Sequence, residues 1–196
     1  MSDLERRTFI LDAIKVEKRD DESRRMIGHA AVFNQLSEDL GGYREQIAPG
    51  AFAEAIQKDD IRALWNHNAD HPLGRNISKT LTLSEDARGL AIEILLPDTQ
   101  VARDLAVSVE RGDVNQMSFG FSVRPGGQDW AKDDSGQVVR TLKRVRLYDV
   151  SPVTFPAYPQ TDVGLREMRA WLDAQAPKVD PTIRVRMLRR RLELSL

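Results

Sequence analysis

The stretch Asn115–Val123 reads NQMSFGFSV and places a serine in the middle of a strand-like run. Its bulky side chains, Met117, Phe119 and Phe121, alternate with small residues, which is the period-2 pattern of a half-buried strand. The bulky face is expected on the core, so Ser118 is expected on the opposite face, between positions with little or no side chain. Such a face leaves room for another backbone or a ligand. Serines on strands are usually just solvated, so this stretch alone establishes no activity.

Length and composition fit one domain with a sizeable core. The chain has 196 residues, of which 41% are hydrophobic and 30% are charged, as in ordinary globular proteins. Its 29 basic and 30 acidic residues give a net charge of -1. A general nucleic-acid binder needs a basic surplus, so no specific nucleic acid is expected as a partner.

The absence of cysteine excludes disulfides, thiolate zinc sites, iron–sulfur clusters and a cysteine nucleophile. No apolar run approaches the roughly 18 residues of a membrane span, and the start, MSDLERRTF, is too charged for a signal peptide. We therefore expect a soluble protein of a reducing cytoplasm, with no membrane partner, no metal and no cofactor.

Short strands separated by turn signals occupy most of the chain up to residue 150. Apolar patterns predict strands at Thr8–Glu17, Met26–Asn34, Ile61–Asn66, Lys79–Ser84, Gly89–Leu96, Asn115–Val123 and Val138–Val150. Loops are predicted at Ser37–Ile47, in HNADHPLGR after Asn66, and at Pro125–Gly136. About seven strands with helices outside them predict a mainly β (α+β) fold, a closed or nearly closed β-barrel.

Helices are predicted at Pro49–Gln57, Asp98–Gly112 and Asp162–Ala174. The second has the clearest ends, because Asp98 or Thr99 can cap its start and Gly112 can stop it. Residues 1–160 are thus expected to form the β-barrel domain, residues 161–176 a C-terminal amphipathic helix, and residues 177–196 a basic tail. The end of the tail carries five arginines and one glutamate between apolar residues, which is typical of an interaction segment.

The chain has three histidines, and one of them suits a general base. His29 lies inside a strand-like run and is expected to be structural. His67 and His71 flank a loop, so their spacing does not place both rings on one helical face, and the glutamate of an H-E-x-x-H motif is missing. A metal hydrolase that uses His67, Asp70 and His71 is therefore a distant alternative. A histidine at a strand end, such as His67, is held by the sheet yet open to a cleft.

A histidine that acts as general base in hydrolysis needs a nucleophile beside it and a group that orients its ring. Ser118 supplies a hydroxyl, and Asp149 in LYDVSPVTFPAYP is expected on a neighbouring strand, on one face with Leu147 and Ser151. Its carboxylate could accept the imidazole N–H. Alternatively, Asp149 could be a turn residue or an ion-pair partner of one of four cations, and spacing alone favours neither interpretation. These cations are Arg140, Lys143, Arg144 and Arg146.

A Ser–Lys dyad that uses Lys143 is a weaker alternative, because no apolar pocket is evident to lower the pKa of this lysine.

Six stretches of the chain carry a family pattern: GHAAVFN at 28–34, GGYREQIAPGAFAEAI at 41–56, ALWNHNADHPLGR at 63–75, GLAIEILLPDT at 89–99, ERGDVNQMSFGFSV at 110–123 and LYDVSPVTFPAYPQT at 147–161. In this order they resemble the prohead maturation proteases of tailed bacteriophages, a serine-protease family whose fold is similar to that of the herpesvirus capsid-assembly protease. The resemblance covers residues 8–165. Each motif is weak alone, but together they are specific, and they imply a herpesvirus-protease-like β-barrel with flanking helices.

The resemblance also implies roles for single residues. His67 follows LWN as the family's histidine does and would be the general base, and Ser118 in MSFGF would be the nucleophile. Asp149 would be the third member, although herpesvirus relatives use a second histidine there, so Asp149 and His71 both stay open. Arg75 and the backbone amides near Ser118 are candidates for the oxyanion hole.

The function implied is that of a serine endopeptidase in phage capsid maturation. Such an enzyme cleaves the scaffolding segment of the major capsid protein and its own terminus inside the prohead, in the host cytoplasm or, when prophage-encoded, in a bacterial cytoplasm. Its partners would be the capsid protein and further copies of itself in a homo-oligomer, and the tail 177–196 would suit packaging and self-removal. The alternative is a non-catalytic capsid assembly or scaffolding protein that retains the fold, in which Ser118 is dispensable.

Overall fold

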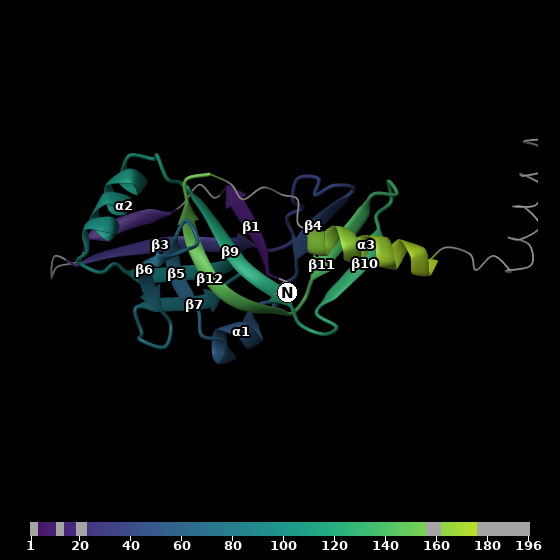
Figure 1. Ribbon diagram of the computed structural model, residues 1–196, viewed down its shortest axis with the longest axis horizontal. Coiled ribbons are helices and arrows are strands. Elements are labelled where there is room, and N and C mark those ends of the chain that lie inside the picture. Colours follow the sequence, from purple (N-terminus) through teal and green to yellow (C-terminus); the bar gives the residue numbers. More distant parts are fainter. Residues whose placement is uncertain (1–3, 11–13, 19–22, 156–161, 176–196) are drawn as a thin grey trace, which may run out of the picture.

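The computed structural model describes residues 4–10, 14–18, 23–155 and 162–175, and Figure 1 shows their arrangement. These residues form twelve strands and three helices. The strands are β1 (Glu5–Ile10), β2 (Lys15–Lys18), β3 (Arg24–Val32), β4 (Tyr43–Ile47), β5 (Arg62–Trp65), β6 (Asn68–Arg75), β7 (Leu81–Glu85), β8 (Gly89–Leu95), β9 (Gln116–Val123), β10 (Gln128–Lys132), β11 (Val138–Leu142) and β12 (Val145–Val153). The helices are α1 (Ala53–Lys58), α2 (Gln100–Glu110) and α3 (Asp162–Gln175).

The strands form three sheets. The largest has five strands in the order β1-β9-β12-β5-β6, the second has four in the order β2-β3-β8-β7, and the third has three in the order β10-β11-β4. The prediction of a mainly β fold with peripheral helices is confirmed. The prediction of a closed or nearly closed barrel of about seven strands is wrong, because each of these sheets ends in two edge strands.

The strand count was underestimated partly because two predicted strands are each divided. The segment Thr8–Glu17 contains β1 and β2, which belong to different sheets. The segment Val138–Val150 contains β11 and β12, because the chain turns where the backbone N–H groups of Lys143 and Arg144 both donate to the Gly127 carbonyl, at 2.7 and 2.9 Å. The turn at Lys143 and Arg144 contains no glycine or proline, so nothing in the sequence indicates that the predicted strand Val138–Val150 is interrupted there.

Three further strands, β4, β6 and β10, lie in segments predicted as loops. The alternation of β4 is hidden because one of its inward side chains is Glu45, which is only 3% exposed. β6 contains Pro72 and several residues that are rare in strands. It forms because it is an edge strand, which tolerates proline better than a central strand does.

The three helices lie outside the sheets, with α2 and α3 at opposite ends of the long axis (Figure 1). α2 confirms its prediction, and the Thr99 side chain caps it by accepting a hydrogen bond from the Ala102 N–H at 3.3 Å. α1 begins at Ala53, four residues after the predicted start, and α3 matches its predicted range closely. None of these described helices is both long and apolar enough to span a membrane. The tail 177–196 lies outside the described residues.

The main core contains the bulky face of β9, as the sequence predicts. Met117, Phe119 and Phe121 are all fully buried. Phe119 meets the Phe52 ring edge-on with centroids 5.5 Å apart, and it lies 5.0 Å from the Phe121 ring. This packing fixes the face of β9 that points inward, and therefore the opposite face that Ser118 occupies.

A cluster of charged side chains is buried between the three-stranded sheet, β1 and α3. The Arg140 guanidinium is fully buried and donates to Glu5 at 2.7 and 2.9 Å, to Glu45 at 3.0 Å and to Glu167 of α3 at 2.8 Å. Arg7 donates to Glu45 at 2.7 Å and to Glu5 at 2.8 Å. Burial alone would raise the pKa of Glu5, but hydrogen bonds and charges from both arginines hold it below its ordinary value. Glu5 thus stays ionised, and the contact between Arg140 and Glu167 ties α3 to the sheets.

Candidate active site

Three adjacent strands of the five-stranded sheet bring Ser118, Asp149 and His67 together. Ser118 lies on β9 and Asp149 on the neighbouring β12, which pairs with β5 on its other side. His67 lies in the turn between β5 and β6, two residues after the end of β5. The His67 Nε2 lies 2.7 Å from the Ser118 Oγ, and its Nδ1 lies 2.5 Å from the Asp149 Oδ2. The side chains predicted from the sequence as a triad therefore form one continuous hydrogen-bonded chain.

A bulge in β12 turns Asp149 toward Ser118. Leu147 pairs with Phe121 on β9, but Asp149 pairs with the next residue along, Gly120, so Tyr148 is an extra residue without a counterpart. Directly opposed residues share a face of the sheet, so Leu147 faces the core with Phe121, whereas Asp149 shares the face of Ser118. The prediction that Asp149, Leu147 and Ser151 share one face is therefore wrong for Leu147.

The small residue at position 120 makes room for the Asp149 carboxylate. A Cβ atom added to Gly120 would lie only 2.4 Å from the Asp149 Oδ1, closer than real Cβ contacts allow. The small-residue face of β9 was expected to admit a backbone or a ligand. Instead, this side chain of the same site occupies part of that space.

Ser151 gives the Asp149 carboxylate a second donor. Its Oγ donates to the Asp149 Oδ2 at 2.7 Å, and it lies directly across from Ser118 in the pairing of β12 with β9. Both serines are fully buried, so the interpretation of Ser118 as an ordinary solvated serine is wrong. The carboxylate oxygen that accepts from His67 is thus fixed from two directions.

His67 reaches Ser118 from a tight two-residue turn. Trp65 pairs with Asn68, and the two residues between them, Asn66 and His67, both have φ of 55°. Positive φ at both central positions is the type I′ geometry of β-hairpins, which asparagine adopts more readily than most residues. The turn places the imidazole beyond the end of β5, back over β12 and β9.

Asn66 fastens this turn to the end of β12. Its backbone N–H donates to the Pro152 carbonyl at 3.0 Å, and its side-chain Oδ1 accepts from the Thr154 N–H at 2.9 Å. Its Nδ2 also donates to the Thr154 Oγ1 at 3.3 Å. The base-bearing turn and the strand of Asp149 are therefore held in one position relative to each other.

The alternative roles considered for nearby residues do not fit this geometry. Lys143 pairs with Asp129 at 2.7 Å, and Arg75 donates to Asp60 at 2.6 and 2.7 Å, so neither contacts Ser118. His71 packs beside Trp65, with ring centroids 6.0 Å apart, and does not take part in the hydrogen-bonded chain.

Other expectations concern ion pairs and metals. No ion pair joins Asp149 to any of the four cations considered, all of which lie within the described chain. Within the same described ranges, no group of three His, Asp or Glu side chains is placed to hold a metal ion. His29, expected to be structural, lies 2.8 Å from the Asp86 carboxylate through its Nε2.

The hydrogen-bonded chain has the arrangement of an activated hydroxyl. When the Nδ1–H donates to the Asp149 carboxylate, the Nε2 carries a lone pair and accepts the Ser118 O–H. The serine proton can then move to the imidazole, and the carboxylate stabilises the imidazolium that results. This arrangement can perform nucleophilic acyl transfer.

Comparison with known proteins assigns the chain to a protein family. Residues 12–173 match the family model of the caudovirus prohead serine proteases. The chain belongs to this family. The predicted resemblance to prohead proteases of tailed phages is therefore confirmed, and the family match includes all three side chains of the hydrogen-bonded chain.

A known prohead protease and a solved structure are similar to the chain. The prohead protease of Enterobacteria phage HK97 is 31% identical over 164 residues, which cover 74% of this chain. The chain spans 65% of the length of that relative. The structure of the bacteriophage T4 capsid assembly protease superposes with a TM-score of 0.50 at 8% identity, over 76% of this chain and 96% of that one. At this identity the similarity to the T4 protein supports the fold.

Proposed function

We propose that this caudovirus prohead serine protease is an active endopeptidase, with Ser118 as nucleophile, His67 as general base and Asp149 as the carboxylate that orients the base. The observation that carries the proposal is the hydrogen-bonded chain from the Ser118 hydroxyl through His67 to Asp149. Family membership supports the reaction class. His71 lies outside the hydrogen-bonded chain, which supports Asp149 as the third member of the triad.

The proposed reaction has two acyl-transfer steps. His67 takes the Ser118 proton while the Oγ attacks the peptide carbonyl carbon, and the imidazolium then gives this proton to the departing amine. Water attacks the acyl-enzyme in the same manner and regenerates the serine. Asp149 keeps the Nδ1–H tautomer of His67 throughout, and Ser151 keeps the carboxylate in place.

Access to the nucleophile is part of the proposed mechanism. Ser118 exposes none of its surface, and the His67 side chain is only 6% exposed. A substrate carbonyl must come within bonding distance of the Oγ, so the atoms that cover Ser118 have to move first. Assays of the proposed activity should therefore include the assembled substrate as well as the isolated protein.

The proposed substrates are the scaffolding segment of the major capsid protein and the protease's own terminus, cleaved inside the prohead by a homo-oligomeric enzyme. The names of two similar proteins, a prohead protease and a capsid assembly protease, support this assignment. Residues 177–196 are the segment proposed for self-removal.

The test is a mass-spectrometric time course of the wild type beside Ser118→Ala, each with and without assembled capsid protein. Ser122→Ala is the matched control, because Ser122 lies on the same strand but bonds to the Tyr148 hydroxyl instead. We expect wild type and Ser122→Ala to trim themselves or the capsid protein, while Ser118→Ala leaves both whole. Equal trimming by the wild type and both variants would show that Ser118 is not the nucleophile. No trimming by any of them would favour the non-catalytic scaffolding protein.

Replacing Gly120 by alanine should disable the site although all three reacting side chains are retained. The new Cβ would collide with the Asp149 Oδ1, so the carboxylate must leave its present position, in which it accepts from His67. A displacement of about 1 Å at such a site can cost about 100-fold in rate. We expect a loss of this size in kcat/KM, measured on a peptide substrate, with Ser122→Ala as control. Wild-type activity in Gly120→Ala would contradict the role given to Asp149.

Replacing Asn66 by alanine should loosen the turn that carries His67. The change removes two hydrogen bonds to Thr154 and a residue suited to positive φ, which together should lower the free energy of unfolding by about 1–3 kcal/mol. We expect kcat to fall about tenfold or more while KM changes little, because the base is misplaced rather than the substrate. Asn66→Asp keeps the acceptor for the Thr154 N–H and should recover part of the loss. Denaturant unfolding and steady-state kinetics measure both effects.

A further inference from the structure

The five-stranded sheet ends in an edge strand that starts at the proposed base. β6 is the last strand of this sheet, and its first residue, Asn68, directly follows His67. Leu64 on β5 pairs with Pro72, whereas Trp65 pairs with Asn68, so residues 69–71 bulge out of the strand. Pro72 therefore lies only about three extended residues, or about 10 Å, from the His67 turn. An extended polypeptide laid along this edge would reach the turn that carries His67.

An apolar pocket opens beside this edge strand. Its volume is about 430 Å³, and its walls come from β6 on one side and from the end of β8 on the other, including Leu73, Leu95 and Leu96. Two arginines, Arg62 and Arg75, also line it, but both form ion pairs with the same Asp60 carboxylate. Asp60 balances only one of these two charges, but it holds both guanidinium groups, and the leucine walls of the pocket suit a large aliphatic side chain.

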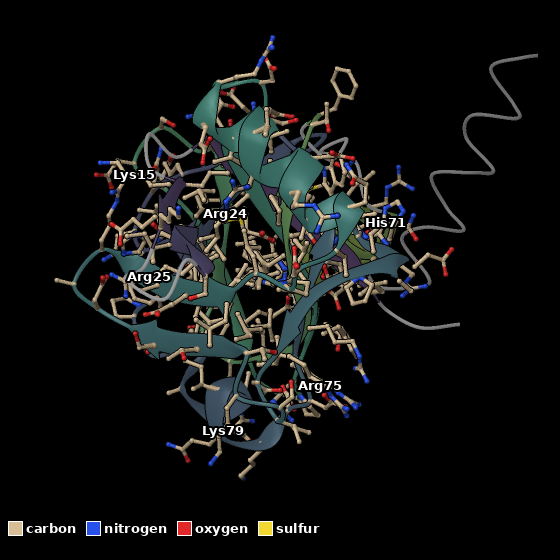
Figure 2. The ribbon with its side chains drawn as sticks, turned by 90° about the vertical axis from the view of Figure 1, so that its left-hand side faces the viewer. Lys15, Arg24, Arg25, His71, Arg75 and Lys79 are labelled. Carbon is tan, nitrogen blue, oxygen red and sulfur yellow. The ribbon has the colours of Figure 1, made fainter. Side chains whose placement is uncertain are left out.

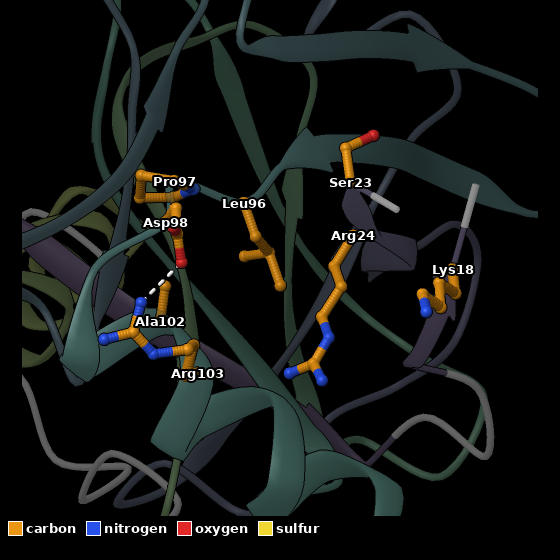
Figure 3. A pocket seen from close by; sticks show the side chains of 8 residues that line it. All are labelled: Lys18, Ser23, Arg24, Leu96, Pro97, Asp98, Ala102 and Arg103. Atoms are coloured by element: carbon orange, nitrogen blue, oxygen red, sulfur yellow. Dashed lines mark hydrogen bonds and ion pairs between the residues drawn. The ribbon is translucent and has the colours of Figure 1, made fainter. Parts of the chain in front are cut away.

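A second, basic pocket adjoins the first. It has a volume of about 480 Å³ and shares Leu96 and Pro97 with the apolar pocket, but it includes no residue of β6, so it lies further from His67. Lys18, Arg24 and Arg103 contribute its cations. Figure 3 shows the Arg24 side chain extended beside Leu96, whereas Arg103 is joined to Asp98.

Arg24 has the feature expected of a recognition residue. Within the described part of the chain, its guanidinium has no hydrogen-bond or ion-pair partner, although the side chain is only partly exposed. A guanidinium presents donors in a planar fork that matches the two oxygens of a carboxylate. The chemistry of this pocket therefore fits an acidic side chain better than an apolar or a basic one.

We propose that these two pockets are recognition subsites for the substrate polypeptide: an aliphatic side chain enters the apolar pocket, and an Asp or Glu further from the scissile bond pairs with Arg24. This inference rests on the proposed endopeptidase function and adds a substrate class to it. The aliphatic residue lies about three to five positions from the cleaved bond, the distance that an extended chain spans between the His67 turn and the apolar pocket.

The test compares wild type, Arg24→Glu and Lys15→Glu in a cleavage-site profile of a mixed peptide library. Lys15→Glu is a matched charge reversal, because Lys15 is exposed on β2 and lies on the same side of the molecule (Figure 2). For wild type and Lys15→Glu we expect enrichment of aliphatic and then acidic residues on one side of the cut. For Arg24→Glu we expect the acidic preference to be replaced by a basic one. On a single acidic peptide, Arg24→Glu should lower kcat/KM about tenfold to a hundredfold, whereas its Gln-substituted counterpart should be cleaved by both enzymes alike.

A binding measurement separates this inference from the proposed function. Fluorescence anisotropy with Ser118→Ala, which cannot turn over, should show tighter binding of the acidic peptide than of the Gln-substituted peptide, and Arg24→Glu in that background should remove the difference. The contrary result is cleavage of the library in a Ser118-dependent manner while Arg24→Glu has the same cleavage profile and peptide binding as the wild type. That result would overturn the proposed subsites and leave the proposed endopeptidase function intact. If cleavage does not depend on Ser118, the proposed function fails.

Discussion

Asp149→Asn should lower kcat by about 10⁴-fold while leaving the fold intact. The carboxylate accepts the Nδ1–H of His67 at 2.5 Å and so fixes the tautomer whose Nε2 can receive the Ser118 proton. An amide offers an N–H to Nδ1 instead, which favours the opposite tautomer and leaves no lone pair facing Ser118. The measurement is single-turnover cleavage of a peptide substrate, with circular dichroism as a check on folding.

His71→Gln is the control for this prediction, because it tests the other candidate for the third member. His71 contacts Trp65 and lies 3.4 Å from the Asn68 side chain, outside the hydrogen-bonded chain. Its replacement should change kcat by no more than a few fold. If instead His71→Gln were inactive and Asp149→Asn remained active, the second histidine would be the orienting group and the assignment of Asp149 would be wrong.

Arg140→Met should lower the free energy of unfolding by about 3–5 kcal/mol. Glu5 and Glu45 are almost fully buried, and their two negative charges are balanced by Arg7 and Arg140. Removal of one arginine leaves a surplus negative charge in a site with little water, and methionine cannot donate to either carboxylate. Urea unfolding at neutral pH measures the loss directly.

Glu167→Gln serves as the comparison for this buried cluster. Glu167 lies on α3, accepts from the same guanidinium at 2.8 Å, but its side chain is 33% exposed. Its replacement should cost about 1 kcal/mol or less, because the glutamine amide oxygen can still accept from Arg140 and water already solvates part of this side chain. Equal losses for Arg140→Met and Glu167→Gln would mean that docking of α3, rather than charge balance within the cluster, dominates.

The parts of the molecule that could be predicted from its sequence are those governed by local pattern. Alternation on β9 correctly assigns Phe119 and Phe121 to the core and Ser118 to the other face, and the caps of α2 lie where propensity places them. The three side chains of the site were also identified, and the structure brings them together. Their catalytic roles remain predictions until the variants are measured.

The features that could not be predicted depend on hydrogen bonds and ion pairs between residues that are distant in sequence. The inward glutamate of β4 is paired with Arg7 and Arg140, which lie 38 and 95 residues away, so no local window reveals a strand there. The clamp from Asn66 to Thr154 likewise joins residues 88 apart. The one local signal that was available is the asparagine at a two-residue turn, which favours the positive φ found at Asn66.

The extra residue in β12 also governs how relatives of this chain can be aligned. Upstream of Tyr148 the strand matches β9 in one register, and downstream it matches in another. An alignment of this strand on its apolar alternation alone would run through the bulge without a gap and place the carboxylate one position away from its true equivalent. In a relative that lacks the extra residue, the carboxylate equivalent to Asp149 should be sought one alignment position away, or on a different strand.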